Sequence, residues 1–231
     1  MMADKFDKYM KALKGGGSPV EGDEVSIAGA GVIQGGTYKV VKASGSLKVQ
    51  GPMRAREFRV AGSARVEGDL TADLVKVSGA IRVEGSLRGD TVKISGSAKV
   101  SGVVAGGLVS VAGGLKSGGV EAGTVKVSGS FRVDGVLKGD VVSLSLSDDS
   151  EAGEITGGTV SVRAERKKVI SILGFSIHKI GGKPVLSVKR IKGGTVRLRD
   201  VVVDGDVEAE QVILEGSAEV RGNVKGEVVR R

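Results

Sequence analysis

The sequence predicts an all-β fold, a single-stranded parallel β-helix whose three-sided coils take about 17 residues each. Two observations support this fold. Between the glycines, apolar and polar residues alternate, which is typical of β-strands. Glycine itself recurs with a step of 17 residues in two series, Gly45, Gly62, Gly79, Gly96 and Gly113, and Gly51, Gly68, Gly85, Gly102 and Gly119. A fixed step of this size indicates repeated units that bury their apolar sides by stacking on one another.

Each repeat unit contains three short strands. In one unit, Val75-Lys76-Val77 precedes the first glycine, Ile81-Arg82-Val83 follows it, and Leu87 marks a third apolar position. Gly, Ser and Asp separate these strands, as expected at corners. Because rungs of a parallel sheet lie about 4.8 Å apart, each residue is expected to stack on its counterpart one coil earlier. Eleven candidate coils begin at Val25, Val41, Phe58, Val75, Val92, Val109, Val125, Val142, Val160, Val196 and Val212.

The repeat divides the chain into four segments. Residues 24–163 and 193–231 are expected to form coils, the second group ending in a short tail, and residues 164–192 to form an insertion between them. Residues 141–158 depart from the glycine pattern, which predicts a distorted coil or a longer corner there.

Residues 1–23 are expected to form a flexible tail with a short amphipathic helix. Apolar residues at helical spacing precede a linker rich in glycine. These residues are a candidate anchor to a membrane surface or to a partner. The alternative is a frayed end or a cap on the first coil, because chain ends are commonly poorly ordered. The candidate anchor residues are Phe6, Tyr9, Met10 and Leu13.

The insertion 164–192 carries +7 of the chain's formal net charge of +8. Its apolar stretches, 169–175 and 185–188, flank a turn at 181–184 and predict a β-hairpin. An apolar hairpin with basic flanks can meet anionic lipid, nucleic acid or an acidic protein surface. The alternative is that its apolar side packs on the solenoid and its lysines are solvated. The candidate residues for an anionic partner or membrane are Arg166, Lys167, Lys168, Phe175, Lys179, Lys183, Lys189, Arg190 and Lys192.

Two basic ladders are predicted along the solenoid itself. Carboxylates at Glu67, Glu84 and Asp134 are the nearest groups that can offset their repulsion. A mutually compensated surface is favoured over a track for a polyanion, because the coils together are nearly neutral. No aromatic residues are interleaved with the cations, which argues against nucleic acid as a partner. One ladder is Lys48, Arg65, Arg82, Lys99, Lys116 and Arg132, and the other is Lys42, Arg59, Lys76, Lys93 and Lys126.

The residue types needed for catalysis or metal binding do not gather in any motif. His178 is the only histidine and the chain has no cysteine, so neither a metal cluster nor a nucleophile and base pair can be built from these residues. Asp148-Asp149 is the nearest approach to a carboxylate cluster. We therefore expect no enzyme activity, no cofactor and no small-molecule substrate.

No run of eighteen apolar residues and no signal peptide is found in the sequence. A cytoplasmic location is expected, with the inner face of the membrane as an alternative position if the tail binds lipid.

The repeat resembles that of the bactofilins, a family of polymer-forming cytoskeletal proteins. The segments that carry the resemblance are Val75–Gly85 (VKVSGAIRVEG) and Val207–Val224 (VEAEQVILEGSAEVRGNV), and the pattern extends over most of residues 25–228. Other β-helical proteins share part of it. The resemblance implies a right-handed β-helix with flexible tails that joins end to end into nonpolar filaments without nucleotide, in some members attached to membranes. This chain is longer and carries the basic insertion.

The open ends of a β-helix give a physical reason to expect self-assembly. Backbone donors and acceptors of an end coil pair with another chain unless they are capped. The candidate polymer contacts are Val25, Ile27, Val212, Leu214 and Val220. The first hypothesis is therefore a homopolymeric structural scaffold. The alternative is a non-polymerising rod whose basic insertion binds an anionic partner, and an enzyme built on a β-helix comes third.

Overall fold

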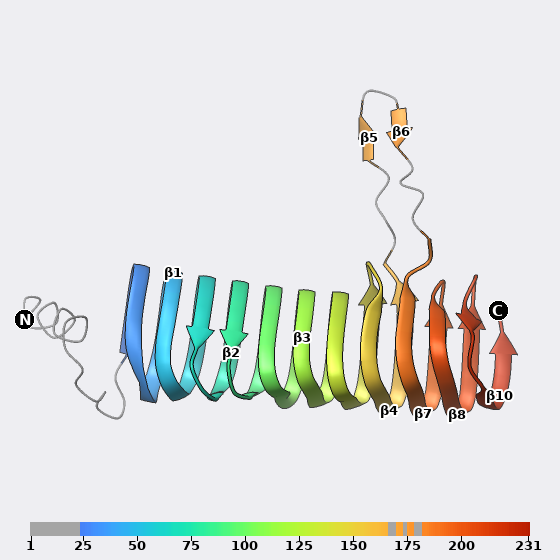
Figure 1. Cartoon of the computed structure of the whole chain (residues 1–231), viewed down its shortest axis with the longest axis horizontal. Coiled ribbons are helices and arrows are strands. Elements are labelled where there is room, and N and C mark those ends of the chain that lie inside the picture. Colours follow the sequence, from blue (N-terminus) through green and yellow to red (C-terminus); the bar gives the residue numbers. More distant parts are fainter. Residues whose placement is uncertain (1–23, 166–169, 173–174, 178–181) are drawn as a thin grey trace, which may run out of the picture.

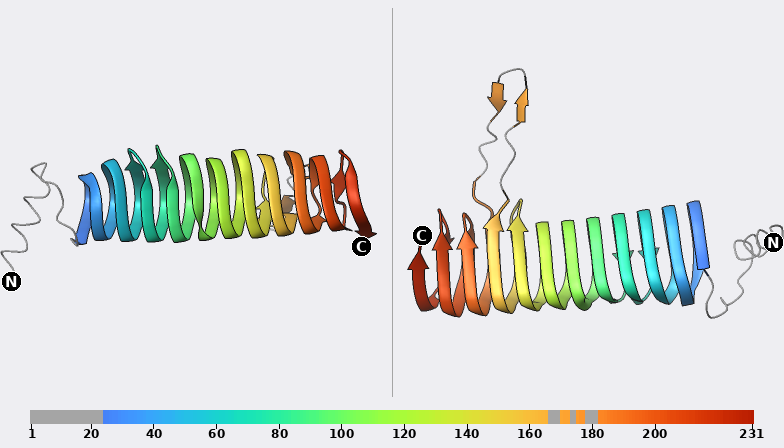
Figure 2. Two further views of the ribbon diagram at one scale, coloured as in Figure 1. Left: turned by 90° about the horizontal axis from the view of Figure 1, so that it is seen from below. Right: turned by 180° about the vertical axis from the view of Figure 1, so that it is seen from behind.

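The computed structural model describes residues 24–165, 170–172, 175–177 and 182–231, and it shows an elongated parallel β-solenoid (Figure 1). The predicted all-β fold is confirmed, and no helix occurs in the described ranges. Two further views show the coils stacked along one axis (Figure 2). The strands are β1 (Glu24–Val66), β2 (Leu70–Val83), β3 (Leu87–Leu146), β4 (Ser150–Ala164), β5 (Ile170–Ile172), β6 (Phe175–Ile177), β7 (Val185–Arg199), β8 (Val202–Glu215), β9 (Glu219–Val220) and β10 (Val224–Arg230).

The strands pair in parallel in the order β1-β2-β3-β4-β7-β8-β10, with β9 also on β8. Between β2 and β3 the ladder runs through three stretches of each coil, marked by the pairs Leu70↔Leu87, Val75↔Val92 and Ile81↔Ala98. These stretches are the three strands that the sequence predicts for one unit. The strands β1 and β3 are each longer than one coil, because the backbone pairing between neighbouring coils continues around most corners.

Inward positions form continuous apolar columns. In the column of strand starts, Val75, Val92, Val109, Val125 and Val142 are fully buried. Burial of a valine side chain contributes about 1.5–3 kcal/mol relative to exposure, so the columns are the main source of stability.

Glycine is required at the first corner of the regular coils. Gly79 and Gly96 have φ values of +127° and +129°, a region that residues with a Cβ rarely adopt. A Cβ on Gly96 would also fall inside contact distance of the carbonyl oxygen of Gly79 in the preceding coil. The 17-residue glycine series therefore reflects one tight turn that is stacked repeatedly.

The insertion is shorter than the sequence analysis predicts. Residues 185–192 belong to the solenoid, because β7 pairs in parallel with β4 through Ser150↔Leu186 and Val160↔Val196. The extra residues thus lie between Ala164 and Val185. The prediction was wrong at this boundary because the alternation in 185–188 fits the arm of a hairpin as well as a strand of a coil. The predicted irregularity at 141–158 is confirmed, since the chain bends at residues 147–149 between β3 and β4.

Within the insertion, β5 and β6 form a separate antiparallel pair with Ile170 opposite Ile177 and Ile172 opposite Phe175. The predicted hairpin therefore exists, but its strands are short, at 170–172 and 175–177 rather than at 169–175 and 185–188. The tail 1–23 lies outside the described residues.

Candidate functional site

The N-terminal end of the described solenoid is an open edge. β1 begins at Glu24, and no strand of the described residues pairs with the outer side of its first coil. The predicted contact residues Val25 and Ile27 are both in this coil, Val25 half-buried and Ile27 only 8% exposed. Ile33 also packs against the core from the same coil. The N-terminal end therefore presents apolar inward residues beside an unpaired backbone edge.

The C-terminal end differs from the prediction. Val212 and Leu214 are buried, because β10 pairs with β8 through Val212↔Val228 and Leu214↔Arg230 and covers them. They are therefore not end contacts in this structure. β10 was missed because a register shift between Lys225 and Glu227 interrupts the 17-residue step.

Val220 is in the final coil, as predicted, and the exposed apolar residues there are Val224 and Val228, with 36% and 46% of their surface accessible. These residues, rather than Val212 and Leu214, are the exposed apolar side chains at the end of the described solenoid.

One column of the core shows how the two ends differ. Leu198, Leu214 and Arg230 are in register at the C-terminal end, so this column finishes on a charged side chain. At the other end the equivalent position is Ile27, two residues before Gly29, on which Gly45 stacks. Arg230 is exposed, whereas Ile27 is buried. A charge at the end of an apolar column opposes the approach of another apolar coil, because it must be desolvated.

A second feature lies on one side of the solenoid, where the first two strands of each coil meet at the glycine corner. We call this surface the basic edge and define it by residues 74–83, 91–100, 108–117 and 125–133. These four segments contain seven lysines and arginines and no acidic residue, and the cations are Lys76, Arg82, Lys93, Lys99, Lys116, Lys126 and Arg132. All seven side chains are exposed. The register Lys76↔Lys93 and Arg82↔Lys99 places them in two rows, one on each side of the corner.

Ion pairs neutralise Arg132, the last cation of the second row, and the equivalent cations Lys48 and Arg65 on the coils that precede the basic edge. Lys48 lies 3.0 Å from Glu67 and Arg65 lies 2.6 Å from Glu84, as the sequence analysis expects for these carboxylates. Arg132 pairs with Glu151 at 3.0 Å, not with Asp134. Among the described residues, the remaining cations of the basic edge have no ion pair, and they are Lys76, Arg82, Lys93, Lys99, Lys116 and Lys126.

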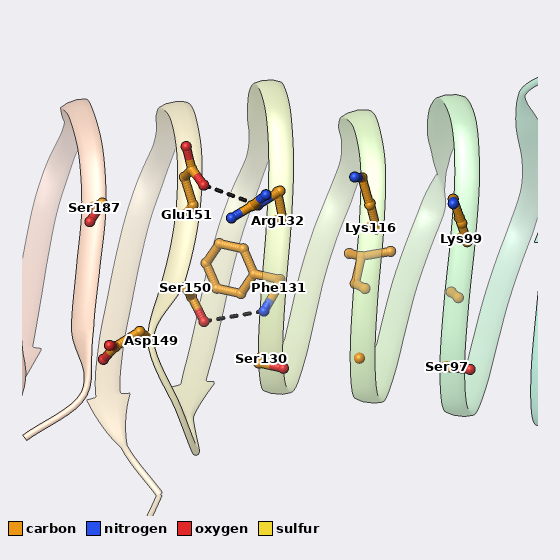
Figure 3. Close-up of a pocket in the computed structure, with 13 residues that line it drawn as sticks. Ser97, Lys99, Lys116, Ser130, Phe131, Arg132, Asp149, Ser150, Glu151 and Ser187 are labelled. Carbon is orange, nitrogen blue, oxygen red and sulfur yellow. Dashed lines mark hydrogen bonds and ion pairs between the residues drawn. The ribbon is translucent and has the colours of Figure 1, made fainter.

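An open groove of about 580 Å³ runs along the second row of the basic edge (Figure 3). Lys99, Lys116 and Arg132 stand side by side along it on successive coils. Its lining also includes Ser97, Gly114 and Ser130, together with the neighbouring apolar residues Ala98, Leu115 and Phe131. The groove ends at Asp149, Glu151 and Ser187, where the bend at residues 147–149 interrupts the regular coils.

The basic residues assigned to the insertion are distributed over different parts of the structure. Arg190 and Lys192 belong to β7, where they lie 4.0 Å from Glu208 and 3.5 Å from Glu154. Lys189 is exposed in the same strand, and Lys183 donates a 2.8 Å hydrogen bond to the carbonyl oxygen of Ser217. Phe175 lies in β6. Arg166, Lys167, Lys168, Lys179, His178 and the tail residues Phe6, Tyr9, Met10 and Leu13 are outside the described residues.

Several aspartates at the corners hold the next coil. Asp149 accepts a 2.8 Å hydrogen bond from the backbone N–H of Val185, and Asp200 accepts one of 3.0 Å from Ser217. The Ser217 backbone N–H lowers the pKa of Asp200 below its ordinary value, and nearby basic groups act in the same direction. The arrangement stabilises turns. In the described ranges, no three acidic or histidine side chains gather as metal ligands.

The fold and these surfaces define the protein as a parallel β-solenoid with one basic side, and no strand of the described residues covers its two ends. Comparison with protein-family models, with curated proteins and with solved structures found no match to this chain. None of the described elements is a helix long and apolar enough to cross a bilayer.

Proposed function

We propose that this protein is a structural scaffold whose solenoids join end to end into filaments without nucleotide. The observation that carries the proposal is the open first coil, where Val25, Ile27 and Ile33 border a backbone edge that no described strand covers. Edges of this kind pair with other chains, and solenoids remain soluble as monomers when polar caps block them. The resemblance of the repeat to the bactofilins supports the same function.

The proposal includes a cytoplasmic location and the protein itself as its main partner. Residues 1–23 are the segment proposed to touch a membrane surface. Catalysis has no part in this proposal, because assembly rests on strand pairing and apolar contact between the ends.

The two ends favour joints of different strength. A joint between two N-terminal coils brings apolar columns together, whereas a joint at the C-terminal end must bury Arg230 or move it aside. We therefore expect the N-terminal joint to form first, at lower protein concentration. Dimers then precede filaments as the concentration rises.

Negative-stain electron microscopy and sedimentation over a concentration series test this proposal. Dimers at low concentration and filaments at high concentration are expected for the natural chain. Ile27→Asp should abolish the first joint, because it places a carboxylate in the apolar column. Val141→Asp is the matched control, since Val141 is 44% exposed in the middle of the rod.

Arg230→Leu sharpens the test at the other end. Removal of the charge should lower the concentration at which filaments appear, while the dimer is unchanged. Discrete monomers at every concentration and salt would contradict the proposed assembly, as would equal behaviour of the Ile27→Asp and Val141→Asp variants.

A further inference from the structure

We propose that the basic edge binds a linear acidic polysaccharide that lies along the axis of the solenoid. This site is separate from the open ends, so it does not depend on self-assembly. It is built from the two rows of cations on residues 74–83, 91–100, 108–117 and 125–133 and from the groove beside the second row.

The first argument is the uncompensated charge. Six exposed cations of the basic edge have no ion pair among the described residues, although Lys48, Arg65 and Arg132 on the same side have carboxylate partners. Like charges stacked on neighbouring rungs repel, and their summed field attracts an anion that spans several coils. A partner with regularly spaced negative charges relieves this repulsion at every rung.

The second argument is the spacing of the cations. The second row, Arg82, Lys99, Lys116 and Arg132, advances by one rung per coil, about 4.8 Å, whereas the first row has Ser110 in place of a cation on the third coil. On an extended peptide, side chains on one face recur about every 6.6 Å, because alternate residues point away. One strand of duplex DNA carries a phosphate about every 3.4 Å. A chain of pyranose sugars linked through opposite sides of the ring advances by about the length of one ring per sugar, which is close to the rung spacing. Its glycosidic bonds can rotate, so the carboxylates of neighbouring sugars can turn toward the cations.

The third argument is the surface between the rows. The corner carries only small residues, which are Ser78-Gly79-Ala80, Ser95-Gly96-Ser97, Ala112-Gly113-Gly114 and Ser128-Gly129-Ser130. Their hydroxyl and backbone groups can exchange hydrogen bonds with sugar hydroxyls. The aromatic side chain beside the groove, Phe131, is 4% exposed and offers no face on which a nucleobase could stack. The surface therefore suits a sugar polymer better than a nucleic acid.

The length of the site is also defined. At its C-terminal side the groove meets the carboxylate of Asp149, which repels an acidic ligand, and Glu151, which already pairs with Arg132. At the other side, Glu67 and Glu84 neutralise the cations of earlier coils. The uncompensated stretch covers four coils, so affinity should rise with chain length up to about four or five sugars and then level off.

The test uses the full chain and polygalacturonate, which has one carboxylate on each sugar, with binding measured by isothermal titration calorimetry at several salt concentrations. The triple variant Arg82→Gln, Lys99→Gln, Lys116→Gln should bind about tenfold more weakly, with a smaller dependence on salt. The matched control is Arg54→Gln, Arg88→Gln, Lys225→Gln, which removes three exposed cations from another side of the rod and should change the affinity less than about twofold.

Three outcomes would overturn the proposal: no binding of polygalacturonate at low salt, equal losses in the two triple variants, or tighter binding of single-stranded DNA or an acidic peptide than of polygalacturonate. Circular dichroism of each variant establishes that the solenoid is intact. Repeating the titration with Ile27→Asp separates this proposal from self-assembly, because that variant should keep its affinity for the polysaccharide.

Discussion

The stacked glycine corners of the regular coils and the corners that replace them after Leu146 make the same turn by different means. In the series from Gly62 to Gly129, each corner glycine stacks on the corner glycine of the preceding coil. All of these glycines have a positive φ. After Leu146 the corner residues include Ser147, Glu165 and Asp200, and side chains take part in holding the coils. Asp149 and Asp200 accept backbone hydrogen bonds from the coil that follows them.

This difference shows how a solenoid tolerates insertions. A stacked glycine corner leaves no room for extra atoms, because each glycine touches the carbonyl group of the previous one. A corner held by a carboxylate can be longer, since the side chain supplies the acceptor that the displaced backbone lacks. The insertion after Ala164 occurs at a corner of this second kind, and Asp149 binds the N–H of Val185, the first residue of the strand that resumes the coil.

The largest effect is expected from a side chain at a stacked glycine. Gly96→Ala should lower the free energy of unfolding by about 3 kcal/mol or more, because it combines a strained positive φ with a clash against the Gly79 carbonyl. Gly114→Ala is the control, since a Cβ there meets no atom within 4 Å. Urea denaturation measures both variants. Similar stabilities for the two would show that the stacked corner is not needed.

Replacing each of two buried serines, Ser150 and Ser117, by valine should change the stability of the fold in opposite directions. Ser150 follows the irregular corner, and its hydroxyl accepts a hydrogen bond from the N–H of Phe131 at 3.1 Å and donates one to the Asp148 carbonyl at 3.2 Å. Ser150→Val should therefore destabilise the fold by about 1–2 kcal/mol. Ser117, in a regular coil, is 1% exposed, and its hydroxyl has no partner among the described residues.

Ser117→Val should instead stabilise the protein by about 1 kcal/mol, because Val100, one step of 17 residues earlier, already fills this position with an apolar side chain. Differential scanning calorimetry of the two variants and of the unchanged protein measures the shifts in Tm that test this contrast. A rise in Tm for Ser150→Val, or a fall for Ser117→Val, would contradict the contrast between the two kinds of coil.

Asp149→Ala should cost about 1 kcal/mol, because it removes the acceptor for the Val185 N–H where the chain returns from the insertion. Hydrogen exchange should quicken at the start of β7 more than elsewhere. Asp148→Ala is the neighbouring control, since the Asp148 side chain is exposed and the hydrogen bond from Ser150 reaches only its backbone carbonyl. Unchanged exchange in β7 of the Asp149→Ala variant would argue against this role.

The smallest effect concerns pH. The folded-state pKa of Asp200 is lowered, chiefly by the N–H of Ser217, so its contribution is complete above the unfolded-state pKa near 4 and is lost as the pH falls through the folded value. Because Asp200 is exposed, the contribution should be below about 0.5 kcal/mol. Asp200→Asn should flatten the stability profile below about pH 5 by this amount. An identical acid profile in the variant would rule out the linkage.

Much of the fold could be predicted from residues that act locally. Alternation such as Val75-Lys76-Val77 sets which side chains point inward, and the glycine step sets where the chain turns, so the coil length, the three strands and the apolar columns were all accessible. The two basic ladders were also visible, because a constant step places equivalent residues on one line.

The candidate sites were less accessible, since they depend on pairing between distant segments. Val212 and Leu214 look like end residues in the sequence, but β10 covers them. Arg132 lies close to Asp134 along the chain, yet its partner is Glu151 on the next coil. The groove along the second row of the basic edge ends where the bend at 147–149 meets the regular coils, and nothing local in Lys99 or Lys116 indicates it.

The sequence by itself determined the repeat, because a period of two and a glycine at each tight corner constrain the backbone within a few residues. Only the tertiary structure decided where the chain returns to the solenoid after Ala164, which coil is last and which cations lack a partner. The physical reason is that strands with the same alternation of apolar and polar residues can pair equally well with several partners. The choice among equivalent partners is made by the stacked ladder as a whole and not by any one segment.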